Sequence, residues 1–199
     1  MRAIWRRLRK LAYLREEHVW YELNLGRPGS RLELPGRLRL ERAEPSEVEI
    51  VTVFGQDVDQ ARERLESGND IWLVREGETP VFLCYTFRAE APVIAAAGGR
   101  LELPVGSACL EDAVTVPEAR GRGIASAAWA AIGDELGRAG LSTLVAKVET
   151  DNVASRRVAE NAGFKPVAVM QHERTGRRRR TAVRPLGGRL GDELAARLS

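Results

Sequence analysis

The chain has 199 residues, of which 44% are hydrophobic and 30% charged, with a formal net charge of +3. This composition supports one hydrophobic core and excludes a disordered or fibrous chain. No run approaches the roughly 18 apolar residues of a membrane-spanning helix. Two cysteines, Cys84 and Cys109, are too few for a disulfide framework or a four-cysteine zinc site. We therefore expect a cytoplasmic protein whose two thiols are buried and free.

Residues 1–25 have the pattern of a basic amphipathic helix. Ile4, Leu8 and Leu11 recur at helical spacing, and all charges from Arg2 to Lys10 are positive. We expect this helix to pack on the rest of the protein and to bring His18 or Tyr21 near a substrate. Contact of residues 1–25 with an anionic membrane surface is the alternative, although three carboxylates in this segment oppose it.

Glycine and proline residues between positions 26 and 36 interrupt the chain. We interpret 1–36 as an N-terminal extension and linker, 37–186 as the globular domain, and 187–199 as a short C-terminal tail. Within the domain, apolar residues alternate in the predicted strands and recur every three or four positions in the predicted helices. Strands are expected over 37–42, 71–74, 81–87, 109–116, 141–149, 164–173 and 177–185, and helices over 58–65, 124–136 and 152–163. This order predicts an α+β fold with a mixed sheet and flanking helices, while 91–106 has no assignment.

Residues 114–126 join a predicted strand to a predicted helix through a turn that contains Gly121 and Gly123. Glycines let the backbone bend tightly and approach a ligand closely. The N-terminus of the following helix favours an anion, and Arg120 and Arg122 add positive charge. This segment is therefore either a phosphate-binding loop or a simple helix entry with two turn glycines.

Two other phosphate-loop families fit this segment poorly. A Walker loop requires a lysine that is missing here. A dinucleotide fingerprint requires its glycines directly after a strand, whereas 117–120 separate them from it, and its third position here is Ser126. In that alternative Glu149, at the end of the next strand, would be the ribose-binding acid.

Two motifs in sequence carry a resemblance to a known family. Residues 120–125 match the pyrophosphate-loop pattern [QR]-x-x-G-x-[GA], and 117–124 match its flanking pattern P-E-x-R-G-x-G-I. Asn152-x-x-Ser155 and Glu160-x-x-Gly163-Phe164 follow at the expected distance. On these residues the sequence resembles the GNAT superfamily of acetyl-CoA-dependent N-acetyltransferases, most clearly over 110–165.

The resemblance implies a mixed, mostly antiparallel sheet whose fourth and fifth strands splay apart at the acyl-CoA site. The pantetheine arm of coenzyme A would lie in that gap like an added strand, and the loop and helix start would hold its diphosphate. The implied cofactor-binding residues are Val114, Val116, Arg120, Gly121, Arg122, Gly123, Ile124, Ala125, Ser126 and Asn152. Of these, Val114 and Val116 would supply backbone groups, and Asn152 would bind the arm through its side chain.

The candidate catalytic residues are Glu111 and Ser155. Acetyl transfer needs a neutral amine, and Glu111, in a Leu-Glu-Asp sequence that some family members share, is the expected general base. Strand alternation places Asp112 on the opposite face of the sheet. Many relatives carry a tyrosine acid where this chain has Ala159, so Ser155 is either the acid or a residue that stabilises the helix start.

The sequence thus predicts an N-acetyltransferase that moves an acetyl group from acetyl-CoA to a primary amine by direct attack on the thioester. A small amine or amino sugar is the first choice of acceptor, and a protein N-terminus or lysine is the second. The arginine clusters at 2–9 and 177–180 leave open a non-catalytic acyl-CoA sensor. We expect no metal and no specific nucleic acid, and the sequence leaves a homodimer open.

Overall fold

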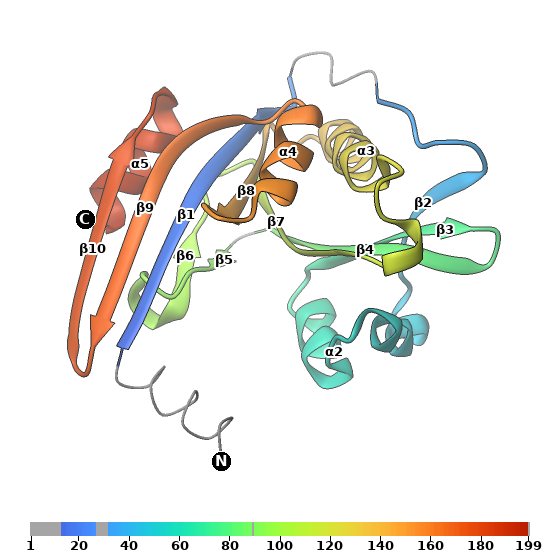
Figure 1. Ribbon diagram of the computed structural model, residues 1–199, viewed down its shortest axis with the longest axis horizontal. Helices are drawn as coiled ribbons and strands as arrows, with labels where there is room; N and C mark the ends of the chain where they lie inside the picture. The colour runs from blue at the N-terminus through green and yellow to red at the C-terminus, as the bar shows by residue number, and fades with distance from the viewer. Residues whose placement is uncertain (1–12, 27–31, 89, 199) are drawn as a thin grey trace.

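In a computed structural model, which describes residues 13–26, 32–88 and 90–198, the chain forms a mixed sheet of eight strands (Figure 1). The strand order is β10-β9-β1-β8-β7-β4-β3-β2, and every neighbouring pair is antiparallel except β7 and β8. The expected α+β class with a mostly antiparallel sheet is therefore confirmed. The strands are β1 (Tyr13–Asn24), β2 (Leu38–Arg42), β3 (Asp70–Glu76), β4 (Thr79–Phe87), β7 (Ser107–Thr115), β8 (Thr143–Glu149), β9 (Lys165–Thr175) and β10 (Arg178–Pro185).

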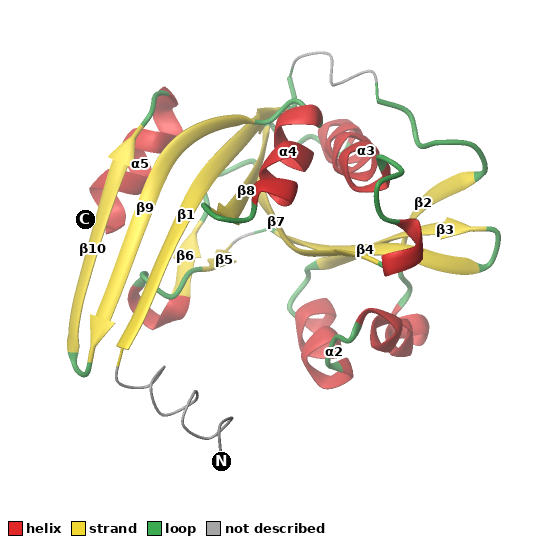
Figure 2. Cartoon of the chain, in the orientation of Figure 1, coloured by secondary structure: helices red, strands yellow, loops and turns green. Residues whose placement is uncertain are grey.

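Helices cover both faces of the sheet (Figure 2). One face carries α3 (Ile124–Arg138) and α4 (Val153–Asn161), and the other carries the 3-10 helix η1 (Pro45–Phe54), α2 (Val58–Glu66) and α5 (Gly188–Leu198). The helix predicted from residue 124 is confirmed, and it ends before Gly140, whose φ of 89° favours glycine. The two faces bury separate hydrophobic clusters.

The first strand corrects the interpretation of the N-terminal segment. Residues 13–24, expected in a helix, form β1, which pairs with β8 on one side and with β9 on the other. Val19, Trp20 and Tyr21 are all buried because a central strand is covered on both faces. The helix prediction is therefore wrong for 13–24, and residues 1–12 lie outside the described part of the chain.

Two further segments contain structure that the sequence did not predict. The unassigned stretch 91–106 contains the small hairpin of β5 (Glu90–Pro92) and β6 (Arg100–Glu102), with the 3-10 helix η2 (Ala97–Gly99) between them. The expected tail contains α5, which buries Leu190, Leu194 and Leu198. The close packing of α5 requires Gly191, because a Cβ atom there would lie 2.3 Å from the Val167 carbonyl oxygen.

The parallel pair is short, and this positions the site. β7 and β8 pair only from Ser107–Thr143 to Leu110–Ala146. Beyond that point β7 continues to Thr115 along β4, and β8 continues to Glu149 along β1. The two strands therefore part, and each presents an unpaired backbone edge to the gap between them.

Candidate active site

A cleft of about 300 Å³ lies where β7 and β8 part, and we call it the β7–β8 cleft. Its walls come from both faces of the sheet, because Leu110 and Trp129 belong to the cluster under α3 and α4, whereas Glu111 points to the other face. The cleft therefore reaches through the sheet. It is lined by His18, Leu110, Glu111, Asp112, Ala113, Trp129, Lys147, Val148, Glu149, Asn152 and Ser155.

Glu111 is the centre of a buried polar cluster. Its side chain is 8% exposed, and each carboxylate oxygen accepts a hydrogen bond. Lys147 Nζ donates to Oε2 at 2.8 Å, and the Cys109 thiol donates to Oε1 at 3.3 Å. The expected base thus lies in the cleft, but it is held in an ion pair by a lysine on the opposing strand.

Burial and pairing act in opposite directions on this cluster. Burial raises the pKa of Glu111, and the charge of Lys147 opposes this rise. Burial acts to lower the pKa of Lys147, but Glu111 outweighs it, so that the lysine pKa is raised. Burial also raises the pKa of Cys109 well above its ordinary value, and the thiol is therefore neutral and a poor nucleophile. Both cysteines are free and buried, as expected.

Asp112 corrects the expectation from strand alternation. Its φ of 50° and the shift of register opposite Leu83 and Tyr85 mark a β-bulge in β7. Glu111 lies opposite Tyr85 in the register. The guanidinium of Arg64, on α2, lies 4.3 Å from the centre of the Tyr85 ring, and its Nη1 lies 2.8 Å from Asp112 Oδ2. Both acidic residues therefore face α2, and alternation fails because the bulge adds a residue.

The loop after β7 has the geometry of an anion site. Gly121 and Gly123 have φ values of 75°, in the region that favours glycine, and Gly123 begins α3 without a side-chain cap. The N–H groups of the first turn of α3, over 124–126, are therefore open to a ligand. Arg122 is not free, because it forms a two-hydrogen-bond ion pair with Glu76 at 2.7 and 2.9 Å.

The backbone at the end of β7 differs from the expectation in register. The Val116 N–H donates to Val81 O at 3.1 Å, so it faces β4 and not the open edge. Val114 lies two residues earlier and faces β4 for the same reason. Thr115, between them, faces the gap, and its carbonyl accepts a hydrogen bond from Arg120 Nε at 3.1 Å.

Asn152 and Ser155 both lie at the start of α4 and line the cleft. Asn152 Oδ1 accepts a hydrogen bond from the Ser155 N–H at 3.0 Å, which is a helix N-cap. The amide nitrogen of Asn152 takes no part in this cap. Ala159 is fully buried. Tyr21 was expected near the substrate, but its hydroxyl instead donates a hydrogen bond to Glu160 on α4 at 3.2 Å.

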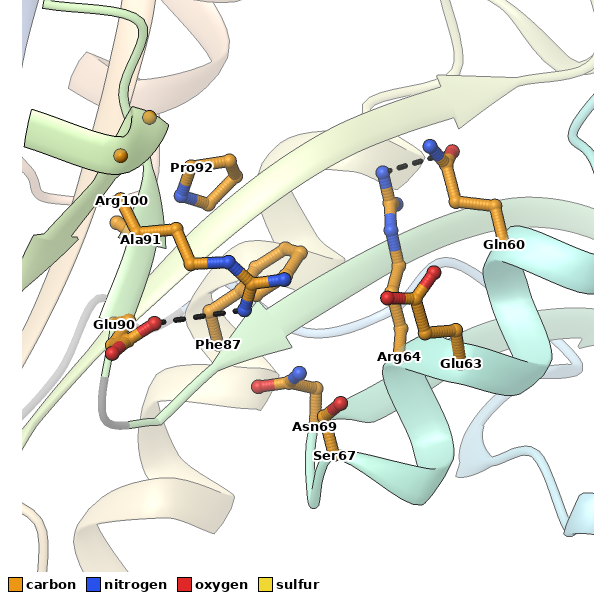
Figure 3. A pocket seen from close by; sticks show the side chains of 12 residues that line it. Gln60, Glu63, Arg64, Ser67, Asn69, Phe87, Glu90, Ala91, Pro92 and Arg100 are labelled. Carbon is orange, nitrogen blue, oxygen red and sulfur yellow. Dashed lines mark hydrogen bonds and ion pairs between the residues drawn. The ribbon is translucent and has the colours of Figure 1, made fainter. Parts of the chain in front are cut away.

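A second, polar cavity of about 200 Å³ lies beside α2 (Figure 3). Arg64 extends along one wall and donates to Gln60 at 3.1 Å, and Glu90 pairs with Arg100 at 3.5 Å on the other. Because Arg64 also holds Asp112, this polar cavity lies on the same face of the sheet as Glu111.

The sequence analysis missed Lys147 and assigned no chemistry to His18. Lys147 carries the only charge within the apolar run 144–148, which is the signal that could have identified it. His18 was expected near the substrate but on a helix; it lines the cleft from a strand beside β8. Across the described ranges 13–26, 32–88 and 90–198 there is no group of three metal-ligating side chains, and no helix in them could span a membrane.

Comparison with known proteins identifies the family of the chain. The family model described as acetyltransferase (GNAT) domain matches residues 37–165. Comparison with curated proteins finds no match. Among solved structures, a GCN5-related N-acetyltransferase from Sphaerobacter thermophilus has a TM-score of 0.59 and 14% identity, over 89% of this chain and 57% of that one. Another from Kribbella flavida has a TM-score of 0.57 and 16% identity, over 93% and 64%.

A third solved structure bears on the ligand. A putative acetyltransferase from Salmonella typhimurium, solved with its cofactor acetyl-CoA, has a TM-score of 0.50 and 16% identity, over 65% of this chain and 80% of that one. At these identities the likeness to solved structures shows the fold. This chain spans 57–66% of the length of the first solved structures it matches.

Proposed function

We propose that this chain, which belongs to the GNAT acetyltransferase family, transfers an acetyl group from acetyl-CoA to a primary amine. The observation that carries the proposal is the β7–β8 cleft, which reaches through the sheet beside a loop suited to phosphate. A thioester can enter it from the α3 and α4 face, and an amine can approach it from the α2 face. Glu111 lies between the two approaches.

Coenzyme A would supply the thioester, and this chain supplies the groups that hold it. The open N–H groups of 124–126, with Gly121 and Gly123 and the side chains of Arg120 and Arg122, would bind the diphosphate. The pantetheine amides would pair with the free edge of β7 near Val114 and Val116, where Thr115 faces the gap. The amide nitrogen of Asn152 would donate to the arm.

The chemistry requires two proton transfers. The amine nitrogen attacks the thioester carbon, the carbon–sulfur bond breaks, and the sulfur leaves as a thiolate. Glu111 would take the first proton from the ammonium, which makes the amine a nucleophile. The nitrogen loses its second proton after the attack, and this proton would pass through the Ser155 hydroxyl to the sulfur, leaving a thiol and a neutral serine. Burial, which raises the pKa of Glu111, suits it for this task because a base works best when its pKa is near the operating pH.

A small amine or amino sugar is the proposed acceptor. The polar cavity beside α2 is lined by Arg64, which pairs with Asp112, the residue after Glu111, and the cavity can hold a small polar molecule. On its wall, Arg100 is paired with Glu90 and Arg64 with Asp112, which leaves the exposed carboxylate of Glu63 as the group that would bind an ammonium. A protein N-terminus or a lysine side chain is the alternative acceptor.

One observation favours a non-catalytic acyl-CoA-binding protein instead. Both oxygens of Glu111 already accept hydrogen bonds, from Lys147 and from Cys109. A carboxylate still has lone pairs for a further proton, so this pairing slows a base without abolishing it. An assay of thiol release across a panel of amines separates the two functions, because a sensor binds acetyl-CoA without consuming it.

The cofactor site is tested with matched glycine variants. Gly123→Val and Gly140→Val both place a branched side chain at a positive φ, and a Cβ atom meets nothing within 4 Å at either position. The two glycines lie at opposite ends of α3 and share the same backbone strain, so both substitutions should lower the free energy of unfolding by similar amounts. Calorimetry should show that Gly123→Val weakens acetyl-CoA binding by at least about 100-fold while Gly140→Val leaves it unchanged. Equal affinity in the two folded variants would contradict the proposed site.

A further inference from the structure

His18 brings a titratable ring into the β7–β8 cleft from outside the region that the family model matches. It lies on β1, whereas the match begins at residue 37. Its position follows from the pairing of β1 with β8, in which His18 lies directly opposite Glu149. Lys147 is its diagonal neighbour on the same face of the sheet, a spacing of about 7–8 Å between Cα atoms.

One ring nitrogen of His18 is unpaired among the described residues. Within the described part of the chain, the buried Nδ1 atom of His18 has no hydrogen-bond partner. Burial and the charge of Lys147 lower the pKa of His18 below its ordinary 6.5, with Glu16 acting in the opposite direction. At neutral pH the imidazole is therefore uncharged.

The ion pair of Glu111 creates a need for a second acceptor. An amine that arrives as an ammonium ion loses two protons from its nitrogen in the reaction. One proton converts the thiolate to a thiol, and the other must leave the enzyme. If that proton stayed on Glu111, the ammonium of Lys147 would be buried without a counter-charge, which is costly. The Cys109 thiol holds its own proton and cannot take another.

We propose that His18 is the proton-relay residue of the cleft, which takes the substrate's proton on from Glu111 through water and releases it to solvent. The transfer restores the Glu111–Lys147 ion pair. Several charged groups face the ring: Glu149 and Lys147 from β8, Glu16 from β1, and Glu111 and Asp112 across the cleft on β7. From β9 the register partner is Met170, which carries no charge, and the diagonal neighbour on the same face is His172.

The test compares two histidines on adjacent strands. His172 on β9 is buried, its Nδ1 lies 2.9 Å from the Thr181 hydroxyl, and it does not line the cleft. His18→Gln should lower kcat for a protonated alkylamine about tenfold to 100-fold, with acetyl-CoA affinity and melting temperature retained. His172→Gln should leave kcat unchanged.

Two readouts distinguish a relay from a structural role. Because the relay needs neutral His18, kcat of the natural sequence should fall as the pH drops through the lowered pKa of this ring, below 6.5, and His18→Gln should lack that step. In His18→Ala, added imidazole should restore part of the lost rate, as it should not in Glu111→Gln.

The proposal rests on the proposed function, and the two can fail separately. If the natural sequence releases no thiol with any amine, both are overturned. If it is active but His18→Gln keeps its kcat and its pH profile, the relay alone is overturned. The relay is likewise overturned if the loss in His18→Ala is insensitive to imidazole or is matched by His172→Gln.

Discussion

β8 has two neighbours in the sheet, and they pair with it over different lengths. On one side β1 pairs with it along its whole length, from Thr143 to Glu149. On the other side β7 pairs only from Thr143 to Ala146 and then departs. On the β1 side, Val19, Trp20, Tyr21 and Leu23 are buried, whereas the gap on the other side holds the Glu111–Lys147 ion pair.

The difference shows how one strand can be both scaffold and binding edge. An unpaired strand edge attracts another extended chain, and β8 has such an edge only beyond Ala146. Continuous pairing with β1 holds β8 in place up to Glu149, so the gap stays open without the strand fraying. The bulge at Asp112 bends β7 away on the other side of the gap.

The largest effect is expected on the open side. Glu111→Gln should lower kcat by about 10² to 10⁴, the usual cost of removing a general base, with little change in acetyl-CoA affinity. The variant also leaves Lys147 without its counter-charge and should melt earlier. Glu111→Gln with Lys147→Met removes both charges and should recover the melting temperature but not kcat. A double variant with normal turnover would mean that the base lies elsewhere.

The fully paired side is tested at Trp20. This side chain is completely buried, so Trp20→Ala should lower the free energy of unfolding by about 3–5 kcal/mol, measured by urea denaturation. Tyr13, at the start of the same strand, is 51% exposed, and Tyr13→Ala should change stability by less than about 0.5 kcal/mol. Equal costs for the two variants would show that β1 does not hold β8.

A smaller effect is expected at Ser155. Its hydroxyl lines the cleft, but its N–H rather than its hydroxyl takes part in the helix cap. Ser155→Ala should therefore lower kcat by about tenfold, less than a general base, because water can also protonate the thiolate. Stability should be unchanged, whereas Asn152→Ala should lose the cap and about 1 kcal/mol. Normal turnover in Ser155→Ala would leave Ser155 with a structural role only.

The smallest effect concerns the charge available to the cofactor. Glu76 pairs with Arg122, and this pairing lowers the pKa of Glu76. Glu76 would therefore compete with a diphosphate for the guanidinium of Arg122. Glu76→Gln should tighten acetyl-CoA binding by less than about fivefold at low salt, and the gain should vanish at about 1 M salt. Glu78→Gln, two residues along, should have no effect. Tighter binding in both variants would point to net charge and not to Arg122.

Local signals predicted the parts of the fold that local interactions determine. The helix from residue 124, the hairpin of β3 and β4, and the glycine loop all follow from short patterns. β1 does not, because a strand buried on both faces shows no alternation, and the helical spacing of Ile4, Leu8 and Leu11 was extended into it. The side chain of Asp112 was misplaced because a bulge depends on the neighbouring strand.

The candidate site divides in the same way. The residues of the loop and the start of α4 could be identified from motifs contained in one segment. Lys147 was missed, and the place of His18 on a strand was not predicted, because both residues join Glu111 at the cleft only when β7, β8 and β1 come together from positions far apart in the sequence. The residue types of Lys147 and His18 show what chemistry they can do, but the sequence does not show which residues they lie beside.

The central position of β1 has a consequence for the synthesis of the protein. Glu149, which pairs with His18, follows it by 131 residues in the chain. At 5–20 residues per second, β1 waits roughly 7 to 26 s for β8. During that time Val19, Trp20 and Leu23 lack their partners on β8, so we expect this segment to bind chaperones and to promote aggregation of unfinished chains.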